Sequence, residues 1–139
     1  MASEMPVAAA VRSYRDATGA PDLMGESHGE FVFAARMAPH HLNGIGIAHG
    51  GFLASSCLQV GRLVAEMALT GPEGDHSAVR SQSCQIAYVR PAPAGSTLLF
   101  HAAVSLCRTS AVGVRVTVAA EDAPDQIIVA GWGTWTRAR

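Results

Sequence analysis

The sequence contains no lysine, because all ten of its basic residues are arginine. Chemistry that depends on a lysine, such as a Schiff base or a P-loop, is therefore excluded. Charge of either sign is scarce: charged residues make up 15% of the chain, and the formal net charge is −1. Nucleic-acid binding needs a basic surface, so this balance argues against a nucleic-acid partner.

Long apolar runs and closely spaced cysteines are also missing. No stretch approaches about 20 consecutive apolar residues, so we expect no membrane span, and the first residues lack the basic region of a signal peptide. The three cysteines, Cys57, Cys84 and Cys107, lie far apart inside apolar segments. This spacing predicts buried free thiols in a reducing, cytoplasmic environment.

Apolar residues, by contrast, make up 49% of the 139 residues. A chain of this length forms one domain with a substantial core, and we assign residues 1–139 to a single domain. The shortage of charge further indicates that a second subunit covers part of an apolar outer surface. We therefore expect a homo-oligomer.

The spacing of apolar residues predicts one long helix and several strands. Helical spacing over residues 7–18 indicates a short helix within an N-terminal extension, residues 1–24. Residues 52–69 are apolar on nearly every side, which is typical of a helix buried on most sides. Alternating patterns predict strands over residues 30–37, 77–89, 98–108, 111–120 and 127–136.

Short turns between the later strands favour an antiparallel meander. A helix that is apolar on nearly every side needs a sheet that curves around it. We therefore expect an α+β fold in which an antiparallel sheet of about five strands wraps around one long central helix.

The chemically richest segment is the loop that leads into this helix, where His49 is followed by Gly50 and Gly51. Backbone N–H groups at a helix N-terminus lack partners within the helix and carry partial positive charge. Glycine lets a ligand approach that backbone closely. The arrangement suits an oxyanion or a polarised thioester carbonyl.

The wider pattern resembles the hotdog-fold acyl-CoA thioesterases of the phenylacetyl-CoA (PaaI-like) type. It comprises Asn43, six residues before His49; the run His49, Gly50, Gly51 and Phe52; and a later segment similar to that family's Tyr-x-x-Pro-Ala motif, residues 87–92. The resemblance covers residues 25–138. It implies the hotdog fold, an acyl-CoA or acyl-carrier-protein substrate, no cofactor, and a homodimer or dimer of dimers with active sites at the subunit interface.

The resemblance also implies roles for individual residues. The amide of Gly50 would polarise the thioester carbonyl, Asn43 and His49 would position the substrate or the attacking water, and Ser81 would assist near the nucleophile. The family usually places an Asp or Glu nine residues after the histidine as general base or nucleophile. This position is Leu58, which can neither accept a proton nor attack a carbonyl.

Neighbouring polar residues on the helix do not replace that carboxylate. The longer polar side chains Gln59, Arg62 and Glu66 form one narrow stripe; an amide is not a base, and Glu66 lies about 12 Å along the axis from Leu58. Arg62 lies on the same helix face as Leu58. It would either bind an anionic group or pair with Glu66 four residues on. With Gly51 and Leu58, Arg62 completes our candidate substrate-binding residues.

Other combinations of residues are weaker candidates. Small polar residues in a packed helix, here Ser55, Ser56 and Cys57, more often allow close packing than act as nucleophiles. His40 and His41 precede His49, but no carboxylate or cysteine lies at ligand spacing, so we expect no metal. Arg80, Arg90 and Arg108 are candidates for CoA phosphates, and Trp132 and Trp135 for core or interface positions.

Three functions remain open. The first is a thioester hydrolase with weakened machinery. The second is a hotdog enzyme of another reaction type, such as cyclisation, dehydration or decarboxylation, with Arg62 as anion anchor. The third is a non-catalytic acyl-CoA-binding dimer. Release of free thiol from acyl-CoAs would support the first function. A large loss of activity on Arg62→Ala would support the second, and binding of acyl-CoA without turnover would support the third.

Overall fold

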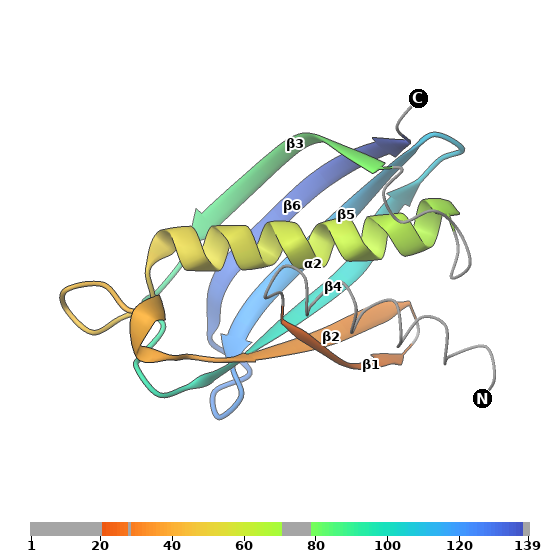
Figure 1. Ribbon diagram of the computed structural model, residues 1–139. Helices are drawn as coiled ribbons and strands as arrows, with labels where there is room; N and C mark the ends of the chain where they lie inside the picture. The colour runs from red at the N-terminus through yellow and green to blue at the C-terminus, as the bar shows by residue number, and fades with distance from the viewer. Residues whose placement is uncertain (1–20, 28, 71–78, 138–139) are drawn as a thin grey trace.

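The computed structural model describes residues 21–27, 29–70 and 79–137, and the short helix expected over residues 7–18 lies outside them. In the described residues six strands accompany one long helix (Figure 1). The elements are β1 Asp22–Ser27, β2 Glu30–Arg36, a 3-10 turn Pro39–His41, α2 Gly50–Thr70, β3 Val79–Tyr88, β4 Thr97–Cys107, β5 Ala111–Ala120 and β6 Ile127–Arg137. The predicted helix and the predicted strands are present within a few residues. β1 begins inside the segment assigned to the N-terminal extension and was not expected.

The strands form a single antiparallel sheet in the order β1-β2-β4-β5-β6-β3. The expected meander is correct for β4, β5 and β6 but wrong for β3, which pairs with β6 at the far edge of the sheet. β3 lies at the far edge because α2 runs across one face of the curved sheet, away from β2, before the chain returns to the sheet as β3 (Figure 1). The α+β architecture, a sheet wrapped around one central helix, is confirmed.

Helix α2 is buried over most of its surface, and the polar stripe expected along it is exposed only in part. Glu66 is only 1% exposed, whereas Leu58 is 37% exposed. Arg62 pairs with Glu66 through Nε and Oε1 at 3.0 Å, as the i+4 spacing allows. The Glu66 side chain is therefore part of the interior, and the apolar Leu58 lies on the open face of the helix.

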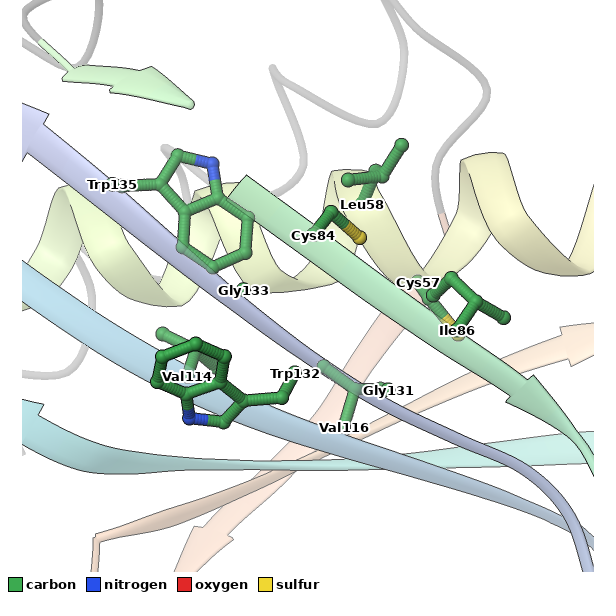
Figure 2. Close-up of a pocket in the computed structure, with 10 residues that line it drawn as sticks. All are labelled: Cys57, Leu58, Cys84, Ile86, Val114, Val116, Gly131, Trp132, Gly133 and Trp135. Atoms are coloured by element: carbon green, nitrogen blue, oxygen red, sulfur yellow. The ribbon is translucent and has the colours of Figure 1, made fainter. Parts of the chain in front are cut away.

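The buried indole of Trp135 packs against both the helix and its own strand β6; Figure 2 shows this side chain on β6. A Cβ added to Gly61 on α2 would lie 2.5 Å from its Cη2 atom, and one added to Gly133 on β6 would lie 2.6 Å from the same atom. Both glycines are therefore required by close packing. Trp132, three residues earlier on the strand, points to the opposite face, where its Nε1 donates to Ser105 Oγ at 2.9 Å.

Replacing Gly61 with alanine is expected to destabilise the protein by about 1–3 kcal/mol, although alanine favours helix. The added methyl group meets an indole that already lies against Gly133 on β6, so the ring must shift out of its packed position. Urea unfolding would measure the loss. The matched control is Gly50→Ala, whose Cβ makes an ordinary contact of 3.5 Å with Tyr88 Oη; equal losses in the two variants would contradict the packing argument.

The prediction that all three cysteines are buried is wrong for two of them. They are free thiols, and Cys57 is buried on α2, but Cys84 and Cys107 are exposed. Cys84 belongs to β3, an edge strand with a neighbour on one side only, and Cys107 lies at the end of β4. The apolar neighbours in the sequence therefore did not determine burial at the edge of the sheet.

Helix α2 is long and apolar enough, by length and composition, to cross a membrane. Within the molecule, however, 56% of its most apolar window is buried against the sheet. That burial is what the core helix of a wrapped sheet requires, and the absence of a spanning segment stays a prediction.

Candidate active site

The loop before α2 has a fixed shape because Asn43 bonds to it. The side-chain oxygen of Asn43 accepts the N–H groups of Ile45 and Ile47 at 3.0 and 3.3 Å. Gly46 has a φ of 81°, which glycine adopts at no steric cost. Asn43 thus shapes the loop, and any contact to a substrate would come from its side-chain NH₂ group, which carries two donors.

His49 caps the N-terminus of α2. Its carbonyl accepts the N–H of Leu53 at 3.2 Å, which begins the helix, and its ring Nδ1 accepts the N–H of Gly51 at 3.0 Å. A Cβ on Gly51 would lie 3.2 Å from Nδ1, a contact too tight for most side chains. Because Nδ1 is an acceptor, the proton of the neutral ring lies on Nε2, and the exposed His49 presents a donor to its surroundings.

Gly50 is the first helical residue, so its N–H belongs to the turn whose donors have no acceptor along the helix. Its carbonyl accepts a hydrogen bond from the Tyr88 hydroxyl at 2.9 Å. Gly50 opens onto a cleft of about 340 Å³ that is mostly apolar. The cleft is lined by Ile47, Ala48, Gly50, Leu53, Tyr88, Val89, Arg90, Pro91 and Ala92. A backbone donor at the wall of an apolar cleft can polarise the carbonyl oxygen of a bound thioester.

His41 holds the loop in place through contacts with Phe52, Ala38 and His49. Its ring stacks on Phe52 with centroids 4.0 Å apart, its Nδ1 accepts the N–H of Ala38 at 3.0 Å, and its backbone oxygen accepts the N–H of His49 at 2.7 Å. Burial, and then the neighbouring His40, lowers the pKa of His41 below its ordinary value of 6.5. The folded protein therefore favours the neutral ring.

Stability is expected to fall as the pH falls below about 6.5, because the unfolded chain then binds a proton at His41 that the folded chain resists. Above that pH the contribution of the neutral ring is fully present. The free energy of unfolding should be measured in urea at pH 8 and pH 5 for the natural chain and for His41→Asn. The two proteins should differ more at pH 8 than at pH 5, and a difference that does not change with pH would refute the assignment.

The remaining candidates lie away from this loop in the same chain. Leu58 follows Gly50 by eight residues, about 12 Å along the helix axis. Ser81 lies on β3 opposite Trp135, seven residues or about 23 Å along the strand from Tyr88. In one chain Asn43, His49 and Gly50 therefore belong to the loop and first turn of α2, whereas Leu58, Arg62 and Ser81 lie outside this segment.

Leu58 and Cys84 both line a small apolar void between α2 and the sheet (Figure 2). Burial, and then Cys84, raises the pKa of Cys57 to about 12, so this thiol is not ionised at neutral pH. Ser55 Oγ donates to the carbonyl of Phe52 at 3.3 Å. A packing role is therefore supported for the buried Cys57, whereas Ser55 is exposed and bonds back to its own helix.

The arginine and metal candidates are also placed. Arg90 lines the cleft beside Gly50, Arg80 lines a separate polar cleft with Arg137, and Arg108 lies in the turn between β4 and β5. Within the described ranges, no group of three or more His, Cys, Asp or Glu side chains is close enough to hold a metal ion.

The sequence predicts no role for two residues of the site. It places Tyr88 within a motif and offers His41 only as a weak candidate for a metal ligand. The contacts of Tyr88 and His41 depend on how the chain folds back. Gly50 and Tyr88, for example, are 38 positions apart in the sequence and bond directly in the structure. The one signal available was the motif itself, since a tyrosine two residues before an Arg-Pro turn faces the helix only when the sheet is folded.

Comparison with known proteins gives a consistent result at the level of structure. No family model and no curated protein matches the sequence. Among solved structures, the chain is similar to a mutant of the phenylacetic acid degradation protein PaaI from Thermus thermophilus, with 25% identity, a TM-score of 0.70, and 90% of this chain and 98% of that one covered.

Two streptococcal structures are similar as well. A Streptococcus mutans protein solved bound to acetyl-CoA shares 22% identity at a TM-score of 0.70, covering 85% of this chain and 88% of that one. A hypothetical thioesterase from Streptococcus pneumoniae solved with coenzyme A shares 16% identity at a TM-score of 0.74, covering 92% and 96%.

Proposed function

The chain has the hotdog fold of the PaaI-like thioesterases, and from this premise we propose that it hydrolyses acyl-CoA thioesters. The observation that carries the proposal is the Gly50 N–H at the N-terminus of a buried helix, at the wall of an apolar cleft. Neighbouring structures that hold acetyl-CoA or CoA support CoA as the carrier of the acyl group.

In the proposed reaction the thioester oxygen lies against the Gly50 N–H, where the developing negative charge of the tetrahedral intermediate is stabilised. His49 Nε2–H and the Asn43 NH₂ group orient the thioester or the attacking water. Water adds to the carbonyl carbon, the carbon–sulfur bond breaks, and the carboxylic acid and the thiol of CoA are released. Leu58 supplies no base for the water, so we expect slow turnover.

The experiment is to incubate the full-length protein with a panel of acyl-CoAs, including acetyl-CoA and phenylacetyl-CoA, and to measure the release of free thiol. Turnover above buffer that depends on His49, tested with His49→Ala, supports the proposal. Absence of turnover on every thioester in the panel would overturn it.

We further propose that the complete site forms between two copies of this chain. β3 is an edge strand whose residues are exposed over most of its length, and it carries Ser81 at one end and Tyr88 at the other. Antiparallel pairing of two β3 strands about a point between Cys84 and Gln85 would bring Ser81 of one copy beside Tyr88 of the other. Light scattering should then give at least twice the chain mass of 14.4 kDa. A monomer would refute the shared site.

The exposed free thiols of Cys84 and Cys107 would persist in a reducing compartment, so we propose a cytoplasmic location. Expression in the native host with cell fractionation would test it, and recovery outside the cytoplasm would contradict it.

A second candidate, an acyl-CoA-binding dimer without catalysis, is favoured by one observation. The position of the usual carboxylate is an apolar side chain that lines an apolar void with Cys57 and Cys84. Calorimetric binding of acyl-CoA without thiol release would establish it. The other enzymatic alternative needs Arg62 as an anion anchor, and the bond from Arg62 to Glu66 favours a structural role for this side chain instead.

A further inference from the structure

The peptide group between Gly50 and Gly51 is held at both of its ends. Its oxygen accepts the Tyr88 hydroxyl at 2.9 Å, and its N–H donates to His49 Nδ1 at 3.0 Å. The C=O and N–H of a trans peptide point in opposite directions within one plane. Tyr88, the peptide and the His49 ring therefore form one continuous chain of hydrogen bonds from β3 to the imidazole.

The direction of donation along this series of hydrogen bonds determines the state of His49. Tyr88 donates, the peptide accepts and donates in turn, and Nδ1 accepts. Each bond in such a series polarises the next, so donation to the carbonyl strengthens the donor at the other end of the peptide. A firmly occupied Nδ1 keeps the ring proton on Nε2 and fixes the plane of the ring.

The packing around the two glycines supports the same series of hydrogen bonds. A Cβ on Gly50 would meet the Oη, Cζ and Cε1 atoms of Tyr88 at 3.5 to 3.7 Å, so the ring lies directly on the helix backbone. A Cβ on Gly51 would lie only 3.2 Å from His49 Nδ1. The two glycines thus leave room for a tyrosine on one side of the peptide and an imidazole on the other.

We propose that Tyr88 is a positioning residue that fixes the orientation and the tautomer of His49 through the peptide between Gly50 and Gly51. His49 then serves the thioester as a hydrogen-bond donor through Nε2–H and not as a general base. This inference rests on the proposed thioester hydrolysis for its catalytic part, but the structural part can be tested without any substrate.

The first measurement is nitrogen-15 NMR of the full-length protein. Nδ1 of His49 should give the shift of an unprotonated acceptor, and a coupling through the hydrogen bond should connect it to the Gly51 amide nitrogen. In Tyr88→Phe, which removes only the hydroxyl, the coupling should weaken and the two ring nitrogens should move toward a mixture of tautomers. A protonated Nδ1 in the natural protein, or His49 signals unchanged by Tyr88→Phe, would overturn the inference.

The second measurement is the kinetics of the same variant. Tyr88→Phe should lower kcat for acyl-CoA hydrolysis about 3- to 10-fold with little change in KM, since one neutral hydrogen bond is lost from the support of His49. Ser105→Ala is the matched control. It removes the hydrogen bond from Trp132 Nε1, also 2.9 Å long, on the outer face of the sheet, and should leave both His49 and kcat unchanged.

If Tyr88→Phe does not fold, incorporation of 3-fluorotyrosine replaces it. A more acidic hydroxyl donates more strongly, so the Gly51 amide proton should shift downfield, and no shift would overturn the inference. A natural protein without thioesterase activity but with the NMR response would refute the proposed function alone. Activity without the NMR response would refute only the role of Tyr88.

Discussion

Replacing Gly50 with proline is expected to lower kcat for acyl-CoA hydrolysis by about 100- to 1,000-fold, the usual loss on removing one oxyanion donor. Gly50 is the first residue of α2, a position at which proline fits a helix well because the missing N–H has no intrahelical partner. The substitution therefore removes the proposed donor and leaves the fold in place. Thiol release measures the rate, and circular dichroism with thermal unfolding verifies the fold.

The matched control is Gly50→Ala, which keeps the N–H and adds a methyl group at ordinary contact distance, 3.5 Å, from Tyr88 Oη. It should retain most of the activity. If alanine and proline reduce kcat equally, the loss comes from crowding of the cleft. If a folded Gly50→Pro protein is fully active, the oxyanion is bound elsewhere.

Replacing Leu58 with aspartate is expected to raise kcat by about 100-fold or more, which is at the lower end of what a positioned general base contributes. Leu58 is 37% exposed on the open face of α2, so a carboxylate can be accommodated without burial of a bare charge. The apolar side chains of Cys57, Cys84 and Ile86 around the position should keep the carboxylate basic.

Leu58→Asn separates charge from shape, because it has the same size as aspartate and cannot accept the proton of water. It should leave the rate near that of the natural protein. An equal gain with asparagine would mean that any polar group suffices. No gain with aspartate, in a protein whose mass shows the dimer, would mean that the two halves of the site are not aligned for hydrolysis.

The central helix could be predicted closely from the sequence because its signal is local. The apolar run over residues 52–69 and the glycines before it mark both the extent of α2 and its N-terminus, and the structure gives Gly50–Thr70. The strands β4, β5 and β6 could be predicted equally well, because alternating apolar residues and short turns specify pairing between strands that are neighbours in the sequence.

The errors share one cause. The position of β3 beside β6, the burial of Glu66 and the exposure of Cys84 each depend on which element lies next to the residue in space. Helical periodicity groups Gln59, Arg62 and Glu66 on a stripe, but it does not say whether the sheet covers that stripe. The i+4 pairing of Arg62 with Glu66 was foreseeable, because both partners lie on the same helix.

What the sequence determined by itself is therefore the shortage of charge, the absence of lysine, the apolar helix and the glycines that begin it. Each follows from residue type and local spacing. The tertiary structure decided that the open helix face presents Leu58, that Tyr88 reaches Gly50, and that Ser81 lies far from His49 in one chain. These are contacts between segments distant in sequence, and they exist only because the sheet curves around the helix to bury its apolar surface.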